Sequence, residues 1–171
     1  MAAKPNLPLL LAVDTNVALD FADERDEVID SVTTIRKRIR EAILCVPPTV
    51  LLELAHAADF GETSGKRAAA KRFLRQHRVW NFRLIHFVPA GLIQVTRIAD
   101  SLREQGLIPA AEVNDSLILA EAALLGCSIL LTSDEHLRGI DFERLTLELQ
   151  SLDATAPVIA TPREIVRKFF H

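Results

Sequence analysis

The sequence lacks the features that would place it in a membrane or on a secretory route. Its 171 residues contain no apolar stretch approaching the roughly 20 residues that a membrane-spanning helix needs. Residues 1–6 carry a single lysine, and the apolar run behind them is short and ends in Asp14, so no signal peptide is indicated. We therefore expect a cytoplasmic protein.

Cysteine is also scarce, with Cys45 and Cys127 as the two residues of this type. Each lies in or beside an apolar run, which predicts two buried free thiols and fits the same compartment. A zinc site built on them would need further ligands at CxxC-like spacing, and the sequence offers none.

The glycine-centred motifs of several common enzyme classes are missing. No Gly-x-Gly-x-x-Gly occurs, so a nicotinamide cofactor is unsupported, and no Gly-x-Ser-x-Gly elbow is present. Residues 61–67 superficially resemble a phosphate loop. The glycine spacing is one residue short, however, Arg67 replaces the Ser or Thr, and no strand precedes the segment, so we reject this interpretation.

What is present is a chain of one-domain size, residues 1–171, with 49% hydrophobic residues and no internal repeat. Short apolar runs predict strands at 8–13, 43–46, 84–87, 128–132 and 158–160. Helical patterns occupy 15–40 with a break near 23, then 48–59, 66–79, 91–105, 111–125 and 161–170. Residues 136–152 fit either element, and we favour a helix. Apolar strands that alternate with helices predict the α/β class, as a three-layer α/β/α sandwich with a mostly parallel central sheet.

Four carboxylates fall where this fold would bring them together. Asp14 ends the apolar run 9–13, and Asp134 ends the run 129–133. Glu53 lies in the helix that follows strand 43–46, and Asp115 opens the apolar helix around 117–120. Because the carboxyl ends of parallel strands face one edge of the sheet, all four acids are expected at a ligand-binding edge. Like charges raise each other's pKa, so this site predicts a hard divalent cation, Mg²⁺ or Mn²⁺.

Each acid also has an ordinary structural explanation when it is taken alone. Asp14 is a suitable cap for the helix at Thr15, Asp134 is suited to cap a short turn, and Asp115 suits the positive end of a helix dipole. Glu53 is harder to explain in this way because its neighbours in 51–55 are apolar, and a carboxylate near a core is costly unless it is paired. The group as a whole favours metal binding.

Several polar residues adjoin these acids. Asn16 is a candidate to orient Asp14 or a water molecule, or else a residue that starts a helix. Thr132 and Ser133 are candidates to hydrogen-bond Asp134 or a water molecule. An aspartyl-phosphate phosphatase would usually need a second Asp two residues after Asp14, where this chain has Asn16.

Three further residues receive structural interpretations. Asn114 is expected to cap the helix of Asp115, and His136 is expected in an exposed turn. His56 lies one helical turn beyond Glu53, but an isolated Glu-x-x-His lacks the preceding His of the zinc protease pattern.

Charge is distributed unevenly along the chain. The net charge is −3, but residues 66–78 contain six Lys or Arg and no acid, which leaves −9 on the remainder. Such a helix face could contact RNA phosphates. Alternatively, it is a solvated face, or it pairs with the acidic stretch 20–30. The candidate RNA-binding residues are Lys66, Arg67, Lys71, Arg72, Arg75 and Arg78.

In four places the sequence resembles the PIN domain family, and in particular its VapC-type toxin ribonucleases. These are Asp14-Thr15-Asn16 after a strand, Glu53 within 48–54, the run from Asn114 to Ala120, and residues 131–137. The resemblance spans residues 9–169 and includes the ending 158–164. It implies an endoribonuclease that uses Mg²⁺ or Mn²⁺ and leaves 5′-phosphate and 3′-hydroxyl ends. Carried over to this sequence, the catalytic and metal-binding set is Asp14, Glu53, Asp115 and Asp134.

The resemblance also implies partners. A small antitoxin protein would cover the acidic site, and a homodimer is expected, for which helix 91–105 has apolar residues to offer. Residues 141–156 are an addition relative to compact members of the family. The rival hypothesis is a binding module that keeps the fold and the acids but holds RNA or a protein partner without cutting, and metal-dependent turnover would separate the two.

Overall fold

The structure is a computed structural model that describes residues 8–169. Its strands are β1 (Leu10–Val13), β2 (Ile43–Val46), β3 (Phe82–Leu84), β4 (Ile129–Leu131) and β5 (Val158–Ala160). Its helices are α1 (Thr15–Ala22), α2 (Asp26–Arg38), α3 (Pro48–Phe60), α4 (Ser64–Gln76), α5 (Pro89–Glu104), α6 (Val113–Leu124), α7 (Glu135–Arg138), α8 (Phe142–Ser151) and α9 (Pro162–Phe169). The strands form one parallel sheet in the order β3-β2-β1-β4-β5.

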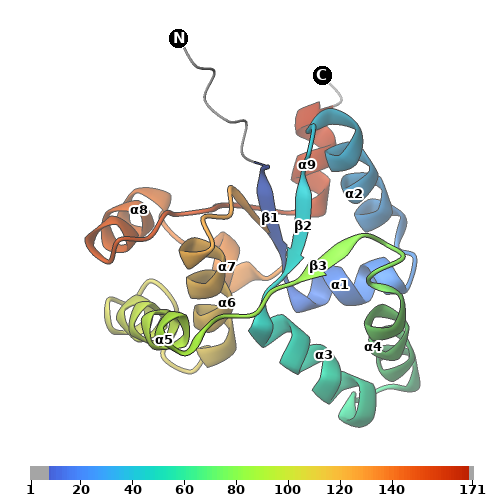
Figure 1. Cartoon of the computed structure of the whole chain (residues 1–171), viewed down its shortest axis with the longest axis horizontal. Helices are drawn as coiled ribbons and strands as arrows, with labels where there is room; N and C mark the ends of the chain where they lie inside the picture. The colour runs from blue at the N-terminus through green and yellow to red at the C-terminus, as the bar shows by residue number, and fades with distance from the viewer. Residues whose placement is uncertain (1–7, 170–171) are drawn as a thin grey trace.

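Helices cover both faces of this sheet. In Figure 1, α5, α6 and α8 lie on one side, and α1, α2, α4 and α9 lie on the other. The helix α3 packs against α1 and α4 in one layer and against α6 in the other, so it closes the carboxyl end of the sheet. The three-layer α/β/α sandwich predicted from the sequence is therefore confirmed, and within residues 8–169 no helix is long and apolar enough to span a membrane.

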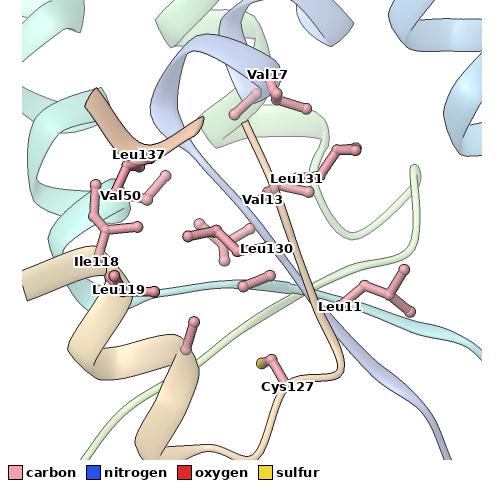
Figure 2. Close-up of a cluster of buried hydrophobic side chains, with 14 of the residues drawn as sticks. Leu11, Val13, Val17, Val50, Ile118, Leu119, Cys127, Leu130, Leu131 and Leu137 are labelled. Atoms are coloured by element: carbon pink, nitrogen blue, oxygen red, sulfur yellow. The ribbon is translucent and has the colours of Figure 1, made fainter. Parts of the chain in front are cut away.

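The strands form where they do because they are apolar on both faces. Leu11 and Val13 of β1 are fully buried, as are Leu130 and Leu131 of β4. Figure 2 shows these four side chains in one cluster with residues from α3 and α6. Burial of this kind, at about 25 cal/mol per Å² of apolar surface, is what holds a parallel sheet between two helical layers.

The chain order of the strands places a crevice beside β1. From β1 the chain moves outward through β2 to β3, and it then returns to place β4 on the other side of β1. The connections that leave β1 and β4 therefore lead to strands at opposite edges of the sheet. In open α/β sheets, this reversal point at the carboxyl ends of the strands is where ligands bind.

The predicted elements exist, but some boundaries differ. The predicted strand 84–87 is in fact β3, Phe82–Leu84, because Phe82 is buried and its ring packs against those of Phe21 and Phe73. The uncertain region 136–152 is helical, as favoured, but it is divided into α7 and α8, and the side chain of Asp141 begins α8 by accepting from the Arg144 N–H at 2.9 Å.

Other predictions hold more closely. The break predicted near residue 23 separates α1 from α2, and Glu24 there has a φ of 58°. Cys45 and Cys127 are buried free thiols, and burial raises the pKa of Cys127 to about 12. The helix predicted at 161–170 is α9, and residue 170 at its end, like residues 1–6, lies outside the described residues.

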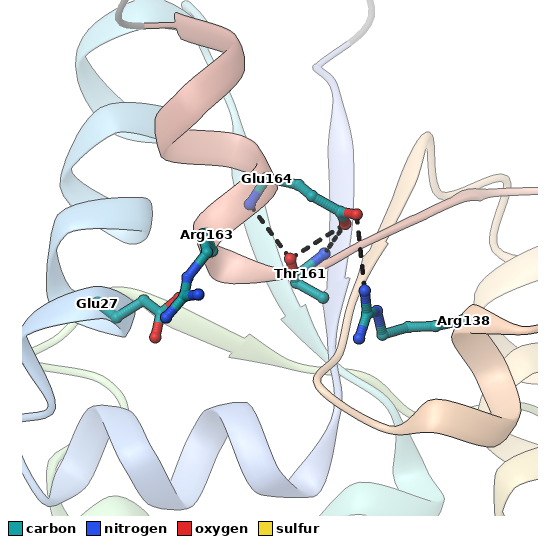
Figure 3. A network of polar contacts seen from close by, with 5 residues as sticks. All are labelled: Glu27, Arg138, Thr161, Arg163 and Glu164. Atoms are coloured by element: carbon teal, nitrogen blue, oxygen red, sulfur yellow. Dashed lines mark hydrogen bonds and ion pairs between the residues drawn. The ribbon is translucent and has the colours of Figure 1, made fainter.

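The start of α9 is fixed by the polar network in Figure 3. Thr161 Oγ1 accepts from the Glu164 N–H at 3.2 Å, and Glu164 Oε2 accepts from the Thr161 N–H at 2.8 Å, which is a capping box. Arg138 of α7 faces Glu164 at 3.9 Å, and Arg163 pairs with Glu27 of α2 at 2.9 Å. These contacts link α9 to both α7 and α2.

Residues 141–156, interpreted from the sequence as an addition to the compact family, contain the single helix α8. This helix packs against α5, and Gln94 of α5 donates to the carbonyl of Leu152 at 3.0 Å. The segment thus extends the layer that contains α5 and α6, on the side of the sheet away from α4 (Figure 1).

Candidate active site

Asp14 lies at the carboxyl end of β1, in the crevice beside β4. Its side chain is buried, with 3% of its surface exposed. Its carboxylate accepts from the Thr15 N–H at 2.5 Å, as the cap of α1, and from Thr132 Oγ1 at 2.7 Å. Burial, assisted by the charges of Glu53 and Asp134, raises the pKa of Asp14 to about 6, although these two hydrogen bonds lower it.

Asp134 follows β4 and approaches the same point from the other side. Its N–H donates to Thr132 Oγ1 at 3.0 Å, so the fully buried Thr132 hydroxyl connects Asp14 with Asp134. The Asp134 carboxylate caps α7 by accepting from the N–H groups of His136 and Leu137 at 2.7 and 3.3 Å. The capping roles considered for Asp14 and Asp134 are thus both present in the structure, alongside their proximity.

Glu53 projects from α3 toward these two residues. Both of its carboxylate oxygens are hydrogen-bonded, one to the Thr15 hydroxyl and the other to Asn114 Nδ2 at 2.7 Å. A half-buried carboxylate in an apolar helix needs such partners. The expectation that Asn114 caps α6 is wrong, because Asn114 lies inside the first turn of α6 and its side chain instead reaches across to α3.

Asp115 completes the group from the first turn of α6. It is half-buried, and its pKa is raised from 3.8 to about 7. Burial is the largest cause, and the charges of Asp134, Asp14, Glu112 and Glu53 supply the rest. The four acids therefore lie close enough to repel one another, as their positions in the sequence predicted, although they come from four separate elements.

A cleft of about 520 Å³ opens over this group. Asp14, Glu53 and Asp115 line it together with Asn16 of α1, while Asp134 lies outside its lining. The cleft is also lined by Lys66 at the start of α4 and by residues of α3 and the loop after it, Leu52, His56, Ala57, Phe60, Gly61 and Glu62.

The donor set suits a hard divalent cation. It consists of carboxylate oxygens whose mutual repulsion a cation would relieve, and Mg²⁺ and Mn²⁺ prefer such ligands. Among residues 8–169, however, no three His, Cys, Asp or Glu side chains converge on one point as a ready-made site. Glu53 is turned toward Thr15 and Asn114, and Asp134 is turned toward the backbone of α7, so these two carboxylates would rotate to join a shared ion.

Of the two polar residues predicted beside Asp134, Thr132 lies inside the acidic site and Ser133 lies outside it. Thr132 contacts Asp14, whereas Ser133 is exposed and lines an adjoining hollow with Asn16 and Lys66. His136 is exposed, as expected, but it lies in the helix α7 and not in a turn, 3.8 Å from Glu112.

Sequence reasoning missed Glu121, a buried acid on α6. Its carboxylate accepts from the Thr49 hydroxyl at 2.8 Å and from the Thr49 N–H at 3.1 Å, so it caps α3 from a neighbouring helix. Burial raises the pKa of Glu121 to about 7. An acid inside the apolar run 117–125 was the signal that could have found it. Its contact ties α3, which carries Glu53, to α6, which carries Asp115.

Within residues 8–169, no ion pair joins the basic helix α4 to the acidic stretch 20–30 with which it was a candidate to pair. Within the described residues, Asp23 pairs with Arg25 and Glu27 pairs with Arg163. Two of the α4 cations serve the fold, since Arg67 donates to the carbonyl of Gly61 and Arg72 to that of Ala22. The other α4 cations, Lys66, Lys71 and Arg75, are exposed, and so is Arg78 just beyond the helix.

The protein is therefore an α/β domain with a parallel sheet and a group of acids at the carboxyl ends of its strands, beside β1 and β4. The PIN domain family model matches residues 11–143, and the chain belongs to this family. PIN domains are generally nucleases, a class of hydrolase. The resemblance seen in the sequence is thus confirmed for the family.

Solved structures agree on the fold. VapBC2 from Rickettsia felis, bound to a DNA fragment from their promoter, superimposes with a TM-score of 0.61 at 15% identity, over 90% of this chain and 98% of that one. VapBC-1 from nontypeable Haemophilus influenzae superimposes with a TM-score of 0.58 at 16% identity, over 90% of this chain and 98% of that one. FitAcB from Neisseria gonorrhoeae superimposes with a TM-score of 0.55 at 17% identity, over 89% of this chain and 97% of that one. Among curated proteins, none matches this sequence.

Proposed function

We propose that this protein is a divalent-metal-dependent endoribonuclease, with residues 1–171 acting as one catalytic domain. The observation that carries the proposal is the proximity of Asp14, Glu53, Asp115 and Asp134, which come from four elements and whose charges help to raise the pKa of Asp14 and Asp115. Membership of a family of nucleases supports it. A phosphodiester is negatively charged and would be repelled by this site unless a cation intervened.

In this proposal the four acids hold Mg²⁺ or Mn²⁺. The bound cation would supply activation of water, orientation of the phosphate and neutralisation of the leaving oxygen. The remaining work belongs to the chain itself. Thr132 holds Asp14 in place and so fixes the orientation of this ligand, which controls metal affinity. Glu53 would exchange its hydrogen bonds with Thr15 and Asn114 for the cation.

The exposed cations of α4 are the proposed contacts for RNA phosphates outside the acidic site. Lys66 lines the cleft itself, and Lys71, Arg75 and Arg78 follow along the helix and just beyond it. Such contacts position a strand without reading its sequence. Arg67 and Arg72, which donate to carbonyls of the chain, are assigned a smaller share.

The proposal extends to biological context. The neighbours in the structural comparison are VapBC and FitAB complexes, which supports a toxin that pairs with a small antitoxin protein and forms a homodimer. Exposed apolar residues on α5, Leu92 and Ile93, are available for the dimer. The proposed compartment is the cytoplasm, to which two buried free thiols are suited.

The test is cleavage of a mixed structured RNA with added Mg²⁺ or Mn²⁺, comparing the wild type, Asp115→Asn and an EDTA control. We expect cutting that needs both the metal and Asp115, with products that carry 5′-phosphate and 3′-hydroxyl ends. If pure folded protein cuts nothing with either metal, the endoribonuclease proposal fails and the binding-module alternative takes its place.

A further inference from the structure

The cleft has a second half that the acidic residues do not use. Along α3, Leu52, His56 and Phe60 follow one another at intervals of four residues and line the cleft beyond Glu53. Leu52 is 71% exposed and Phe60 72% exposed. Large apolar side chains this open to water, lined up beside a candidate site, indicate a surface that a ligand covers.

Phe60 and His56 form a paired aromatic surface. Their ring centroids are 5.1 Å apart and the ring planes are tilted by 35°. Phe60 is seven residues beyond Glu53, which places it about 10 Å along the helix on nearly the same side. An aromatic face at this separation suits a flat ring system that belongs to the same ligand as the group held at the acidic end.

A cation lines the same cleft as this aromatic pair. Lys66 contributes to the lining of the cleft and also to the adjoining hollow with Asn16 and Ser133. Its position in the first turn of α4 opposes the helix dipole, and it makes no ion pair within residues 8–169, so helix stability does not explain it. The cleft thus presents carboxylates, an aromatic face and an unmatched positive charge.

This combination of groups in one cleft matches a single-stranded nucleic acid. Bases stack on aromatic side chains whatever their identity, and phosphates between them meet Lys or Arg. An apolar protein segment would cover Phe60 but would leave Lys66 without a partner. We propose that a base adjoining the cleaved phosphodiester stacks on Phe60 and His56 while Lys66 contacts the next phosphate, an inference that rests on the proposed endoribonuclease function.

The test measures binding separately from cutting. In an Asp115→Asn background, the affinity of a fluorescein-labelled single-stranded RNA 12-mer of mixed sequence is compared with that of a 12-mer of abasic ribose phosphates. The variants are Phe60→Ala, Phe60→Trp and Phe142→Ala, the last a matched control because Phe142 is a half-exposed phenylalanine on α8. Thermal unfolding confirms that each variant is folded.

We expect Phe60→Ala to raise the Kd for the 12-mer about tenfold, equivalent to ~1.4 kcal/mol, because one stacked base is lost. Phe60→Trp and Phe142→Ala should stay within about twofold of the background, and the abasic strand should respond to none of the three. Lys66→Ala should weaken both strands and reduce the slope of log Kd against log salt by about 0.7. In the otherwise wild-type enzyme, Phe60→Ala should raise KM with little change in kcat.

Two results would overturn the inference. One is a Phe60→Ala effect no larger than that of Phe142→Ala. The other is equal loss for the normal and abasic strands, which would mean that Phe60 covers some other ligand, such as an apolar segment of a protein partner. If the wild type cuts RNA but Phe60 has no base-dependent effect, this inference fails and the endoribonuclease proposal stands. If nothing is cut yet Phe60 still discriminates the two strands, the catalytic proposal fails and the stacking site stands.

Discussion

Two sets of acids lie beyond the carboxyl ends of this sheet, and their electrostatics are opposite. Beside β1 and β4, Asp14 and Asp115 have pKa values raised to about 6 and about 7. Beyond β5, Glu164 is exposed, and its hydrogen bonds from Thr161 hold its pKa below the usual value, with Arg138 lowering it further (Figure 3). A position at the carboxyl end of the sheet therefore does not by itself raise the pKa of a carboxylate. Burial among other acids raises it, and this difference distinguishes the candidate site from the capping network at the start of α9.

The largest effect on activity is expected from removing the Thr132 hydroxyl, which connects Asp14 with Asp134. Thr132→Val keeps the buried volume but leaves the Asp14 carboxylate without its 2.7 Å donor, so Asp14 loses its fixed orientation. We expect kcat/KM for RNA to fall about 10- to 100-fold. Thr132→Ser should recover most of this activity, since it restores the hydroxyl.

The matched control is Thr161→Val, which removes a hydroxyl from the capping network beyond β5. It should weaken α9 without changing kcat/KM more than about twofold, because Thr161 touches no acid of the cleft. Equal losses in the two variants would mean that Thr132 acts through stability and not through Asp14.

The next effect is on stability and concerns the buried acid on α6. Glu121→Ala leaves the N–H and hydroxyl of Thr49 without their acceptor in a buried setting, so the free energy of unfolding should fall by about 1–3 kcal/mol. Glu164→Ala removes an exposed acid and should cost about 0.5 kcal/mol. Urea unfolding measures both. A Glu121→Ala protein as stable as the wild type would show that water replaces the carboxylate at the start of α3.

The pH dependence of stability sharpens the same contrast. The pKa of Asp115 is raised from 3.8 to about 7 and that of Asp14 from 3.8 to about 6. Between the ordinary value of 3.8 and these raised values, the folded state therefore binds more protons than the unfolded state. The stability of metal-free protein should therefore fall as the pH rises from about 4 to about 7, and Asp115→Asn should flatten this decline. Glu164, with a lowered pKa, acts in the opposite direction and at lower pH.

Added Mg²⁺ gives a second readout of this effect. A cation bound by the ionised acids should raise the Tm at pH 7.5, where they are charged, and have little effect at pH 4.5, where Asp14 and Asp115 are protonated. A Tm that responds to Mg²⁺ equally at both pH values would place the ion elsewhere on the protein.

The sequence was informative where one local rule decides the outcome. Asp14 and Asp134 follow apolar runs, and a parallel sheet brings the ends of such runs to one edge, so their meeting could be predicted. The strand β3 was misplaced by two residues because the packing of the Phe82 ring against Phe21 and Phe73, which is a tertiary contact, decides its register.

The errors near the site have the same origin. Asn114 looked like a cap because it precedes Asp115 at the start of a helix, but α6 begins at Val113, and this turns the Asn114 amide toward Glu53 on another helix. Glu121 carries no local signature beyond its charge, because its partner Thr49 is 72 residues away in the chain. Contacts between distant elements are what position these side chains, and periodicity within one element does not encode them.

The smallest effect belongs to the exposed ion pair that joins α9 to α2. Arg163 and Glu27 approach to 2.9 Å, but their side chains are 74% and 48% exposed, so solvent screens the pair and ordering two long side chains offsets the attraction. Arg163→Ala should therefore lower the free energy of unfolding by less than about 0.5 kcal/mol, and this difference should vanish in 1 M NaCl, where the Debye length is about 3 Å. RNA cleavage should be unchanged. A loss above 1 kcal/mol that persists in high salt would show that Arg163 packs against α2 through its aliphatic stem, and the network beyond β5 would then stabilise the fold by contact area more than by charge.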